Sequence, residues 1–436
     1  MSPTNAQPAF LLAPAVQNYA WGKDAQTSTV AYFAKATSAL QEDDAKPYAE
    51  LWMGTHPSGP AVPLTDTGDL MGPGFAELLE HNPSLLGDQV KGPQLPFLLK
   101  ILSVSKALSI QAHPDRTLAS RLYSDDPDHY PDPNHKPEMT IALTPFRALC
   151  GFRPLPEIVK AIQTYPELAE LLHADQINAL EKASTMQDKD SEEARSALQA
   201  IFSRVMRADP AQVADLLDTM VSRIQSKDDS TNLDRLILLL NEQYPGDIGC
   251  FAALFLNDIL LQPGESLFLA ANEPHAYITG DCVECMAASD NVVRAGLTPK
   301  FRDVDTLVSM LTYRVEPPLA HYLRPRPYSD VPYTKLYEAP VPECRVLDTT
   351  IPDGSTVSFP HLSTPSVAIC TRGPMTVEWK RVTDHQSGTL SLVDGSVLFI
   401  GANVSIRMSP SKDKDHHPVT LYRAYCGDDV IEMNNH

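Results

Sequence analysis

Two polar side chains, Gln111 and His113, stand two residues apart in the stretch SIQAHP. The preceding residues, PFLLKILSVSKAL, are largely apolar and are typical of a buried strand. Successive side chains of a strand point to opposite faces, so Gln111 and His113 should face the same cavity. Burying two polar groups at one place is costly unless a partner binds them, and a metal ion is the first candidate.

Three later segments contain groups that would complete such a site. DPNHKPEM contains His135 and Glu138, NEPHAYITGD contains His275, and DNVVRAGLTPKFRDV contains Arg294 and Lys300. Two imidazoles, a carboxylate and an amide oxygen form a ligand set that suits zinc and leaves room for catalysis. The residues alone also allow a simpler interpretation, in which the histidines belong to the core and Glu138 caps a turn.

The composition excludes several classes of partner. The 436-residue chain has a formal net charge of −20, which argues against nucleic acid, because phosphate backbones attract clustered lysine and arginine. An anionic substrate would therefore need a local basic pocket. With 43% hydrophobic and 21% charged residues the chain is typical of a soluble globular protein. The 38 prolines, roughly twice the usual share of about 5%, favour many short strands and turns.

The N-terminal segment and the cysteines indicate a cytoplasmic protein. Residues 1–22 lack a basic stretch and their apolar run is short, so we expect no signal peptide. No apolar run is long enough to span a bilayer, so we expect no membrane association. The seven cysteines are scattered and odd in number, unlike a disulfide framework. Cys282 and Cys285 form a C-x-x-C without a second pair, and we expect them to pack within a strand.

The chain changes its pattern twice. Residues 1–152 contain short apolar runs between turns and prolines, which is typical of strands. Residues 154–250 show helical periodicity, and Asp209-Pro210 is a helix start with an N-cap followed by proline. Strand character returns near residue 251 and continues to the end. One helical face combines apolar residues at helical spacing, namely Leu198, Ile201, Phe202 and Val205.

A weak internal repeat relates GESLFLAANEPH (264–275) to GSVLFIGANVSI (395–406). Each copy has a turn glycine, a strand and a second turn, so we predict two β-barrels of jelly-roll type. Ile406 stands where the first copy has His275, so only the first barrel should bind a metal through this position. Glu138 and His275 flank the helical segment yet should meet, within roughly 4–5 Å for two metal bonds of about 2 Å.

These motifs together resemble those of the type I mannose-6-phosphate isomerase family, zinc enzymes of the cupin superfamily. The stretches are PFLLKILSVSKALSIQAHP, DPNHKPEM, NEPHAY and ECMAASDNVVRAGLTPKF, and YAWG and ELWMGTHPSGP fit as well. The strong matches cover about 93–153 and 264–303. The resemblance implies an interconversion of mannose 6-phosphate and fructose 6-phosphate through an enediol. It also implies a supply of mannose for GDP-mannose synthesis and protein glycosylation.

The resemblance assigns roles to individual residues. It implies that one zinc per chain is held by Gln111, His113, Glu138 and His275, and that Arg294 is an active-site residue. His135 would lie beside the metal without binding it. The base stays open among Glu284, Lys136, His135 and a metal-bound hydroxide. Candidates for binding the phosphorylated substrate are Lys100, Ser109, Lys136 and Lys300.

The expected fold is mainly β with an α insertion: two cupin-type jelly-roll barrel domains plus a helical domain. Residues 1–153 and 251–330 would form the discontinuous catalytic zinc-binding domain. Residues 154–250 would form the helical insertion, and residues 331–436 a C-terminal jelly roll without metal. We expect a cytoplasmic monomer whose partner is a small sugar phosphate.

Two other functions are compatible with part of the motif set. An iron-dependent cupin oxygenase would hold its metal through His113, Glu138 and His275, but Gln111 and the basic residues argue against it. A non-catalytic sugar-binding or storage cupin would have no use for Arg294 or Lys136. Neither accounts for the complete set of motifs.

Overall fold

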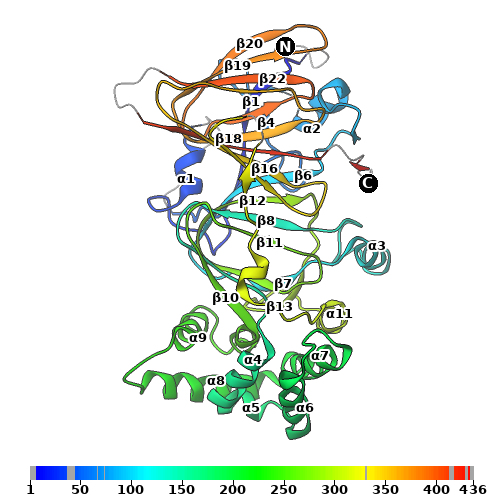
Figure 1. Cartoon of the computed structure of the whole chain (residues 1–436), viewed down its shortest axis with the longest axis vertical. Coiled ribbons are helices and arrows are strands. Elements are labelled where there is room, and N and C mark those ends of the chain that lie inside the picture. Colours follow the sequence, from blue (N-terminus) through cyan, green and yellow to red (C-terminus); the bar gives the residue numbers. More distant parts are fainter. Residues whose placement is uncertain are drawn as a thin grey trace.

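The computed structural model describes residues 6–36, 45–65, 67–72, 74–328, 331–411, 417–427 and 431–432. The molecule is elongated, with the helical region at one end, the C-terminal strands at the other, and a second strand-rich region between them (Figure 1). The chain is therefore mainly β with a helical part, as its sequence predicts. Among the described residues, no helix combines the length and the apolar character needed to cross a bilayer.

The central region is a ten-stranded sheet built around the long strand β12. β12 pairs in antiparallel fashion with β6 and β8 along one half and with β7 and β9 along the other. The strands of this sheet are β2 (Ala15–Gln17), β3 (Glu50–Met53), β6 (Phe97–Val104), β7 (Ile110–Ala112), β8 (Glu138–Ala142), β9 (Phe146–Phe152), β10 (Leu256–Leu261), β11 (Ser266–Leu269), β12 (His275–Ala287) and β13 (Val293–Gly296).

A break in β12 explains how one strand serves both halves. Its register shifts between Tyr277 and Thr279, and Gly280 follows with a φ of +116°. A Cβ at Gly280 would lie 2.6 Å from the carbonyl oxygen of Pro145, which is too close. Any other residue would therefore clash there, and its backbone would be strained at this φ. The shift lets residues on either side of the break face the same interior, as a bulge does.

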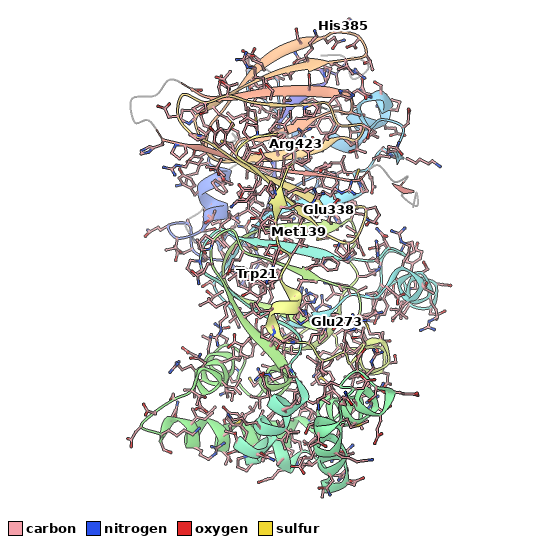
Figure 2. The ribbon with its side chains drawn as sticks, viewed as in Figure 1. Trp21, Met139, Glu273, Glu338, His385 and Arg423 are labelled. Carbon is pink, nitrogen blue, oxygen red and sulfur yellow. The ribbon has the colours of Figure 1, made fainter. Side chains whose placement is uncertain are left out.

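The two faces of the central sheet have different partners. Along β6, Leu99 and Ile101 pack in the core shared with the C-terminal strands, whereas Lys100 and Leu102 point to the opposite, interior face. The shared core also contains Met139, which is labelled in Figure 2. The back of the central sheet is therefore covered from within the chain, and Lys100 lies on the opposite, interior face.

The C-terminal region contains an eight-stranded sheet and a four-stranded sheet with an apolar core between them. β1 and β4, from the beginning of the chain, lie at one edge of the larger sheet, where β1 pairs with β21. The strands are β1 (Ala9–Ala13), β4 (Val62–Pro63), β14 (Arg326–Pro327), β15 (Thr334–Glu338), β16 (Arg345–Ile351), β17 (Val357–Phe359), β18 (Ser366–Arg372), β19 (Met375–Arg381), β20 (Ser387–Leu392), β21 (Val397–Ile400), β22 (Val404–Pro410) and β23 (Val419–Tyr425).

The internal repeat is visible in the backbone. Gly264 and Gly395 both have a φ of +84°, and Asn272 and Asn403 both have a φ of +63°. In each copy a short strand follows the glycine, and a longer strand follows the asparagine. Ile406 lies in the apolar core of the C-terminal region, so the two copies share a backbone but differ in the chemistry of the equivalent position.

The helices of residues 155–252 confirm the predicted periodicity. Leu198, Ile201, Phe202 and Val205 are buried in one core, and Asp209 accepts hydrogen bonds from the backbone of Ala211 and Gln212 as the predicted N-cap. The helices are α4 (Leu155–Thr164), α5 (Pro166–Glu170), α6 (Ala174–Thr185), α7 (Glu192–Met206), α8 (Pro210–Gln225), α9 (Asn232–Gln243) and α10 (Gly249–Ala252), followed by the 3-10 turn η2 (Ala253–Phe255).

The described part of residues 1–152 also contains the helices α1, α2 and α3 and the 3-10 helix η1, although its sequence is typical of strands. Asp115 shows why α3 forms, because its side chain accepts a hydrogen bond from the backbone of Leu118 and caps the first turn. The remaining elements are α1 (Thr29–Ala34), α2 (Phe75–His81), η1 (Pro83–Leu85), β5 (Val90–Lys91), α3 (Arg116–Asp125), α11 (Val304–Met310), η3 (Pro318–His321) and β24 (Ile431–Glu432).

Candidate metal centre and active site

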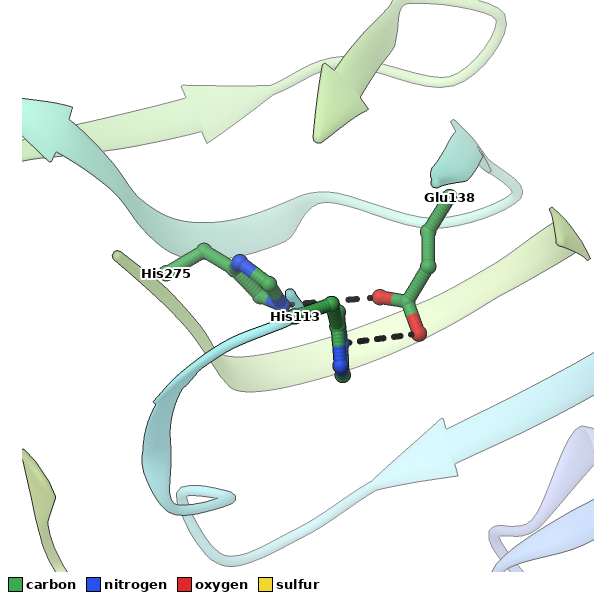
Figure 3. Close-up of side chains that lie close together, drawn as sticks. All are labelled: His113, Glu138 and His275. Carbon is green, nitrogen blue, oxygen red and sulfur yellow. Dashed lines mark ion pairs between the residues drawn. The ribbon is translucent and has the colours of Figure 1, made fainter. Parts of the chain in front are cut away.

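Three buried side chains converge in the interior of the central sheet (Figure 3). His113 follows β7, Glu138 begins β8 and His275 begins β12. The Nε2 atom of His113 lies 3.3 Å from Glu138 Oε1, and the Nε2 atom of His275 lies 3.5 Å from Glu138 Oε2. The predicted meeting of Glu138 and His275 across the helical segment is therefore confirmed.

In each neutral imidazole the proton lies on Nδ1, the nitrogen that points away from Glu138. His113 Nδ1 donates to the backbone oxygen of Asn291 at 2.6 Å, and His275 Nδ1 donates to that of Glu273 at 3.1 Å. A carbonyl oxygen only accepts, so in the neutral rings each Nε2 has a bare lone pair. Both Nε2 atoms are buried without a hydrogen-bond partner. Two lone pairs thus face one carboxylate.

This spacing fits a metal ion. Ligand bonds of about 2.0–2.1 Å in a tetrahedron place neighbouring ligand atoms about 3.3 Å apart. One ligand atom from each of the three residues lies within 4.8 Å of the others, and the distances of 3.3 and 3.5 Å from the two imidazole nitrogens to the two carboxylate oxygens are close to that value. Imidazole nitrogens with a carboxylate oxygen form a donor set that zinc accepts. The residues present therefore fit this metal.

The protonation states of His113 and Glu138 are those that metal ligands need. Burial lowers the pKa of His113 to about 4, although Glu138 opposes the shift, so the ring is neutral at physiological pH. Burial would raise the pKa of Glu138, but His113 and Lys136 outweigh it and hold this pKa well below its usual value. A neutral imidazole at His113 and a carboxylate at Glu138 are the forms that bind a cation.

Gln111 lies between His275 and Arg294 in the sheet. In the strand pairing its Cα is opposite His275 on one side and opposite Arg294 on the other, so the three side chains share a face. Ser109 Oγ donates to Gln111 Oε1 at 3.1 Å and so fixes the orientation of the amide. The expected grouping of Gln111 with the histidine and the arginine is therefore present in the register.

Arg294 has a guanidinium that the described part of the chain leaves without a hydrogen bond or ion pair. It is partly buried, and this burial lowers its pKa. Lys300 lies on the exposed loop between β13 and α11, and no contact joins its side chain to the metal-site residues among the described residues. Lys136 lies at the centre, with its Nζ 3.3 Å from Glu138 Oε1.

Lys100 is held between two carboxylates on the interior face. Its Nζ lies 3.3 Å from Glu50 Oε2 and 3.2 Å from Glu284 Oε2, and its side chain is 6% exposed. Burial lowers the pKa of Lys100, but the two carboxylates outweigh burial and raise it above the ordinary value. Trp52 Nε1 donates to Glu50 Oε2 at 2.5 Å, and Tyr277 Oη donates to Glu284 Oε1 at 2.9 Å. The result is a continuous buried polar network.

A cavity of about 350 Å³ adjoins this site. The metal-site residue His275 lines it together with Glu273, Arg314, Glu316 and His321. Burial raises the pKa of Glu273 to about 7. Figure 2 labels Glu273 near η3, at the lower part of the central region. The cavity is large enough for a small polar molecule and reaches the metal-site residues from the side of η3.

Family models of two domains match the chain. The catalytic domain of type I phosphomannose isomerase matches residues 9–155, and the helical insertion domain of the same family matches residues 171–256. Mannose-6-phosphate isomerase of Bos taurus is 44% identical over 97% of this chain and 99% of its own length. The chain belongs to the type I phosphomannose isomerase family.

Other members of the family are similar over the same span. The mannose-6-phosphate isomerase of Ogataea parapolymorpha is 41% identical over 97% of this chain and 99% of its own length. A zinc-bound crystal structure of a mannose 6-phosphate isomerase superposes with a TM-score of 0.77 at 27% identity, covering 97% of this chain and all of that one. A mutant phosphomannose isomerase from Salmonella typhimurium gives the same TM-score and identity over 96% of this chain and all of that one.

Sequence reasoning missed several residues of this phosphomannose isomerase fold. Glu50 and Trp52 alternate within ELWMG in the same way as Gln111 and His113, so the same strand argument would have placed them on one face. Asn291 was missed because it acts through its backbone oxygen, which no side-chain pattern reveals.

The two cysteines of the C-x-x-C lie on opposite faces of β12. Cys282 belongs to the interior core, and Cys285 belongs to the core shared with the C-terminal strands. An odd spacing of three in a strand separates the thiols in this way. The expectation that they pack within a strand is therefore confirmed.

The triad of Glu50, Lys100 and Glu284 generates a stability prediction. Lys100→Met would leave two buried carboxylates without their cation, so the free energy of unfolding should fall by about 3–5 kcal/mol. Urea unfolding followed by circular dichroism measures this change. Arg326→Met serves as a control, because it breaks an exposed ion pair with Glu338. Equal unfolding free energies for the two variants would contradict the account of the triad.

Proposed function

We propose that this chain is a zinc-dependent isomerase that interconverts mannose 6-phosphate and fructose 6-phosphate. The observation that carries the proposal is the convergence of two unprotonated imidazole nitrogens on one carboxylate at metal-ligand spacing. It occurs in a chain that is 44% identical, over nearly its full length, to an enzyme of that name. In the direction from fructose 6-phosphate, the reaction would supply mannose 6-phosphate for GDP-mannose synthesis and glycosylation.

We propose that His113, Glu138 and His275 hold one zinc per chain and that Gln111 provides the fourth protein ligand. The register places Gln111 directly beside His275, and Ser109 orients its amide oxygen. When bound, zinc supplies a Lewis acid that polarises the substrate oxygens without redox chemistry. Because Asn291 and Glu273 fix the ring protons through backbone oxygens, the histidines need no rearrangement to bind.

The isomerisation moves a proton from C2 to C1 and a second proton from the C2 hydroxyl to the C1 oxygen, so no oxidant is needed. The first transfer passes through an enediol, and negative charge develops on oxygen. Arg294 is suited to stabilise this charge, because its guanidinium has no partner within the described protein and shares a face with Gln111 and His275.

Among the candidate bases we propose Glu284. His135 Nε2 is engaged by Glu343 at 2.9 Å, and Lys136 Nζ lies beside the proposed ligand Glu138. Burial raises the pKa of Glu284 while Lys100 opposes the shift, which brings the carboxylate nearer to the range useful for proton transfer. Its side chain faces the interior, where Tyr277 fixes one oxygen.

We propose two groups of substrate contacts. Lys100 and Lys136 are buried beside carboxylates, which suits them to hydroxyl and carbonyl oxygens near the reacting carbons. Ser109 is partly exposed and Lys300 is exposed, and both suit the phosphate, which keeps its charge at the mouth of the site. In a chain of net charge −20, this local basic character is what admits an anionic substrate.

We propose the cupin-type arrangement for the whole chain. Residues 1–153 and 251–330 would form the catalytic jelly-roll barrel, 154–250 the helical insertion and 331–436 a second jelly roll without metal. The matched φ values of the repeat support two related barrels. The N-terminal strands β1 and β4, however, belong to the sheet of the C-terminal region. We further propose a cytoplasmic location, supported by cysteines that are all buried and form no disulfide, and a monomeric state, which light scattering tests.

The proposed function is tested by metal removal. Purified protein should contain about one zinc per chain and form fructose 6-phosphate from mannose 6-phosphate in a coupled assay. A chelator should abolish this activity, and added zinc should restore it. His113→Ala or His275→Ala should lose the zinc, because each variant removes one of the two imidazoles among the four proposed protein ligands. Bound iron with oxygen-dependent turnover would instead identify an oxygenase.

Arg294→Ala separates chemistry from binding. If the guanidinium stabilises the oxyanion, kcat should fall by about 10²–10³ while KM changes little. Arg294→Lys should recover only part of the rate, because an ammonium lacks the planar fork. Zinc content, measured by mass spectrometry, should stay unchanged in both. A rise in KM alone would move Arg294 to the phosphate contacts.

Glu284→Gln tests the proposed base. The amide keeps the shape and still accepts from Tyr277 but does not take a proton, so exchange of the substrate C2 proton with deuterated solvent should stop. NMR of mannose 6-phosphate recovered from the variant measures this exchange. Retained exchange at the wild-type rate would rule out Glu284 and return the choice of base to the other candidates named from the sequence.

A further inference from the structure

Glu343, from the C-terminal part of the chain, contacts Arg116 and His135, which lie close in sequence to the proposed metal ligands His113 and Glu138. It lies between β15 and β16, and its side chain is only 2% exposed. Its Oε1 accepts a hydrogen bond from Arg116 Nη2 at 2.9 Å and another from His135 Nε2 at 2.9 Å. The two donor atoms lie 3.0 Å from each other, so both converge on a single carboxylate oxygen.

The two donors belong to the segments that carry the proposed metal ligands. Arg116 follows His113 by three residues and begins α3. His135 precedes Glu138 by three residues and lies in the turn that leads into β8. A single oxygen of Glu343 therefore joins the segment of one ligand to the segment of the other.

A second connection runs between the same two segments. Asn291 accepts from His113 Nδ1 through its backbone oxygen, and its side-chain amide donates to the backbone oxygen of Asn134 at 2.9 Å. Asn134 and His135 are neighbours, so Asn291 and Glu343 hold the same turn. Asn291 provides the connection from the central region, and Glu343 provides the one from the C-terminal region.

Burying the charged carboxylate of Glu343 costs solvation free energy. Burial would raise its pKa, but His135 and Arg116 outweigh burial and lower it, so the group stays charged. Its second oxygen, Oε2, is buried and has no hydrogen-bond partner. An apolar contact of similar volume would join the two regions without this cost. The arrangement therefore favours a role in geometry over a role in stability alone.

We propose that Glu343 is a positioning residue of the metal centre, through which the C-terminal region sets the separation of His113 and Glu138. The inference rests on the proposed zinc-dependent function. It assigns the C-terminal region a part in the active site, although that region provides no metal ligand. Arg116 and His135 transmit the effect, and neither of them needs to touch the metal.

Glu343→Gln is the central test, because the amide has the same shape but lacks the charge that attracts both donors. Zinc release from the holoenzyme to a chromogenic chelator should become about tenfold faster, the scale on which partners of metal ligands act. In the isomerase assay kcat should fall by a larger factor than KM rises, since of the proposed substrate contacts only Lys136 lies in the turn that Glu343 holds. The release rate is a readout independent of turnover.

Glu167→Gln is the matched control. Glu167 is also buried, at 4% exposure, and pairs with Arg223 through two hydrogen bonds of 2.7 Å, but it lies in the helical region. This variant should lower the melting temperature without changing zinc release or kcat. If Glu343→Gln lowers the melting temperature in the same way and leaves zinc release and kcat at wild-type values, Glu343 is merely structural and the inference is overturned.

Arg116→Ala carries the test if Glu343→Gln does not fold, because the Arg116 side chain is half exposed. It should also speed zinc release, and the double variant should release zinc no faster than the more affected single variant. Independent, multiplying effects would overturn the inference. A wild-type protein that holds no zinc or does not isomerise would instead refute the proposed function.

Discussion

Three electron-pair donors that face one another with no proton between them impose the main constraint on this fold. The Nε2 lone pairs of His113 and His275 point at the Glu138 carboxylate in the buried interior, because the opposite side of each ring donates to a backbone oxygen. Such a grouping is stable only around a cation. The surrounding strands must therefore keep these atoms close in spite of their repulsion.

β12 is the element that satisfies this constraint. It begins with His275, carries Glu284 in the interior, and pairs with β7, β8 and β9 through registers that leave little freedom. Its opposite face packs Val283 and Cys285 against the C-terminal strands. The same strand thus connects the metal centre, the buried Lys100 network and the second sheet. A displacement of β12 at one of these three places would therefore also move the residues of the other two.

The sequence was sufficient for the features that have local periodicity. Strand alternation predicted that Gln111 and His113 share a face, the repeat predicted that Ile406 stands where the first copy has His275, and helical spacing predicted the helices of residues 155–252. It did not reveal that Lys100 lies between Glu50 and Glu284, because strand pairing brings these carboxylates in from distant segments. Glu343 was missed for the same reason, since its partners lie far away in the chain and a single glutamate in a turn has no pattern.

The pairing of β1 with β21 affects how this chain folds during synthesis. β1 is synthesised long before its partner β21, because the two strands lie far apart along the chain, so this pairing must wait until the residues between them have been made. Contacts of such long sequence separation slow folding. Until then the apolar AFLLA segment presents unpaired backbone groups, which makes nascent chains candidates for chaperone binding and truncated chains prone to aggregate.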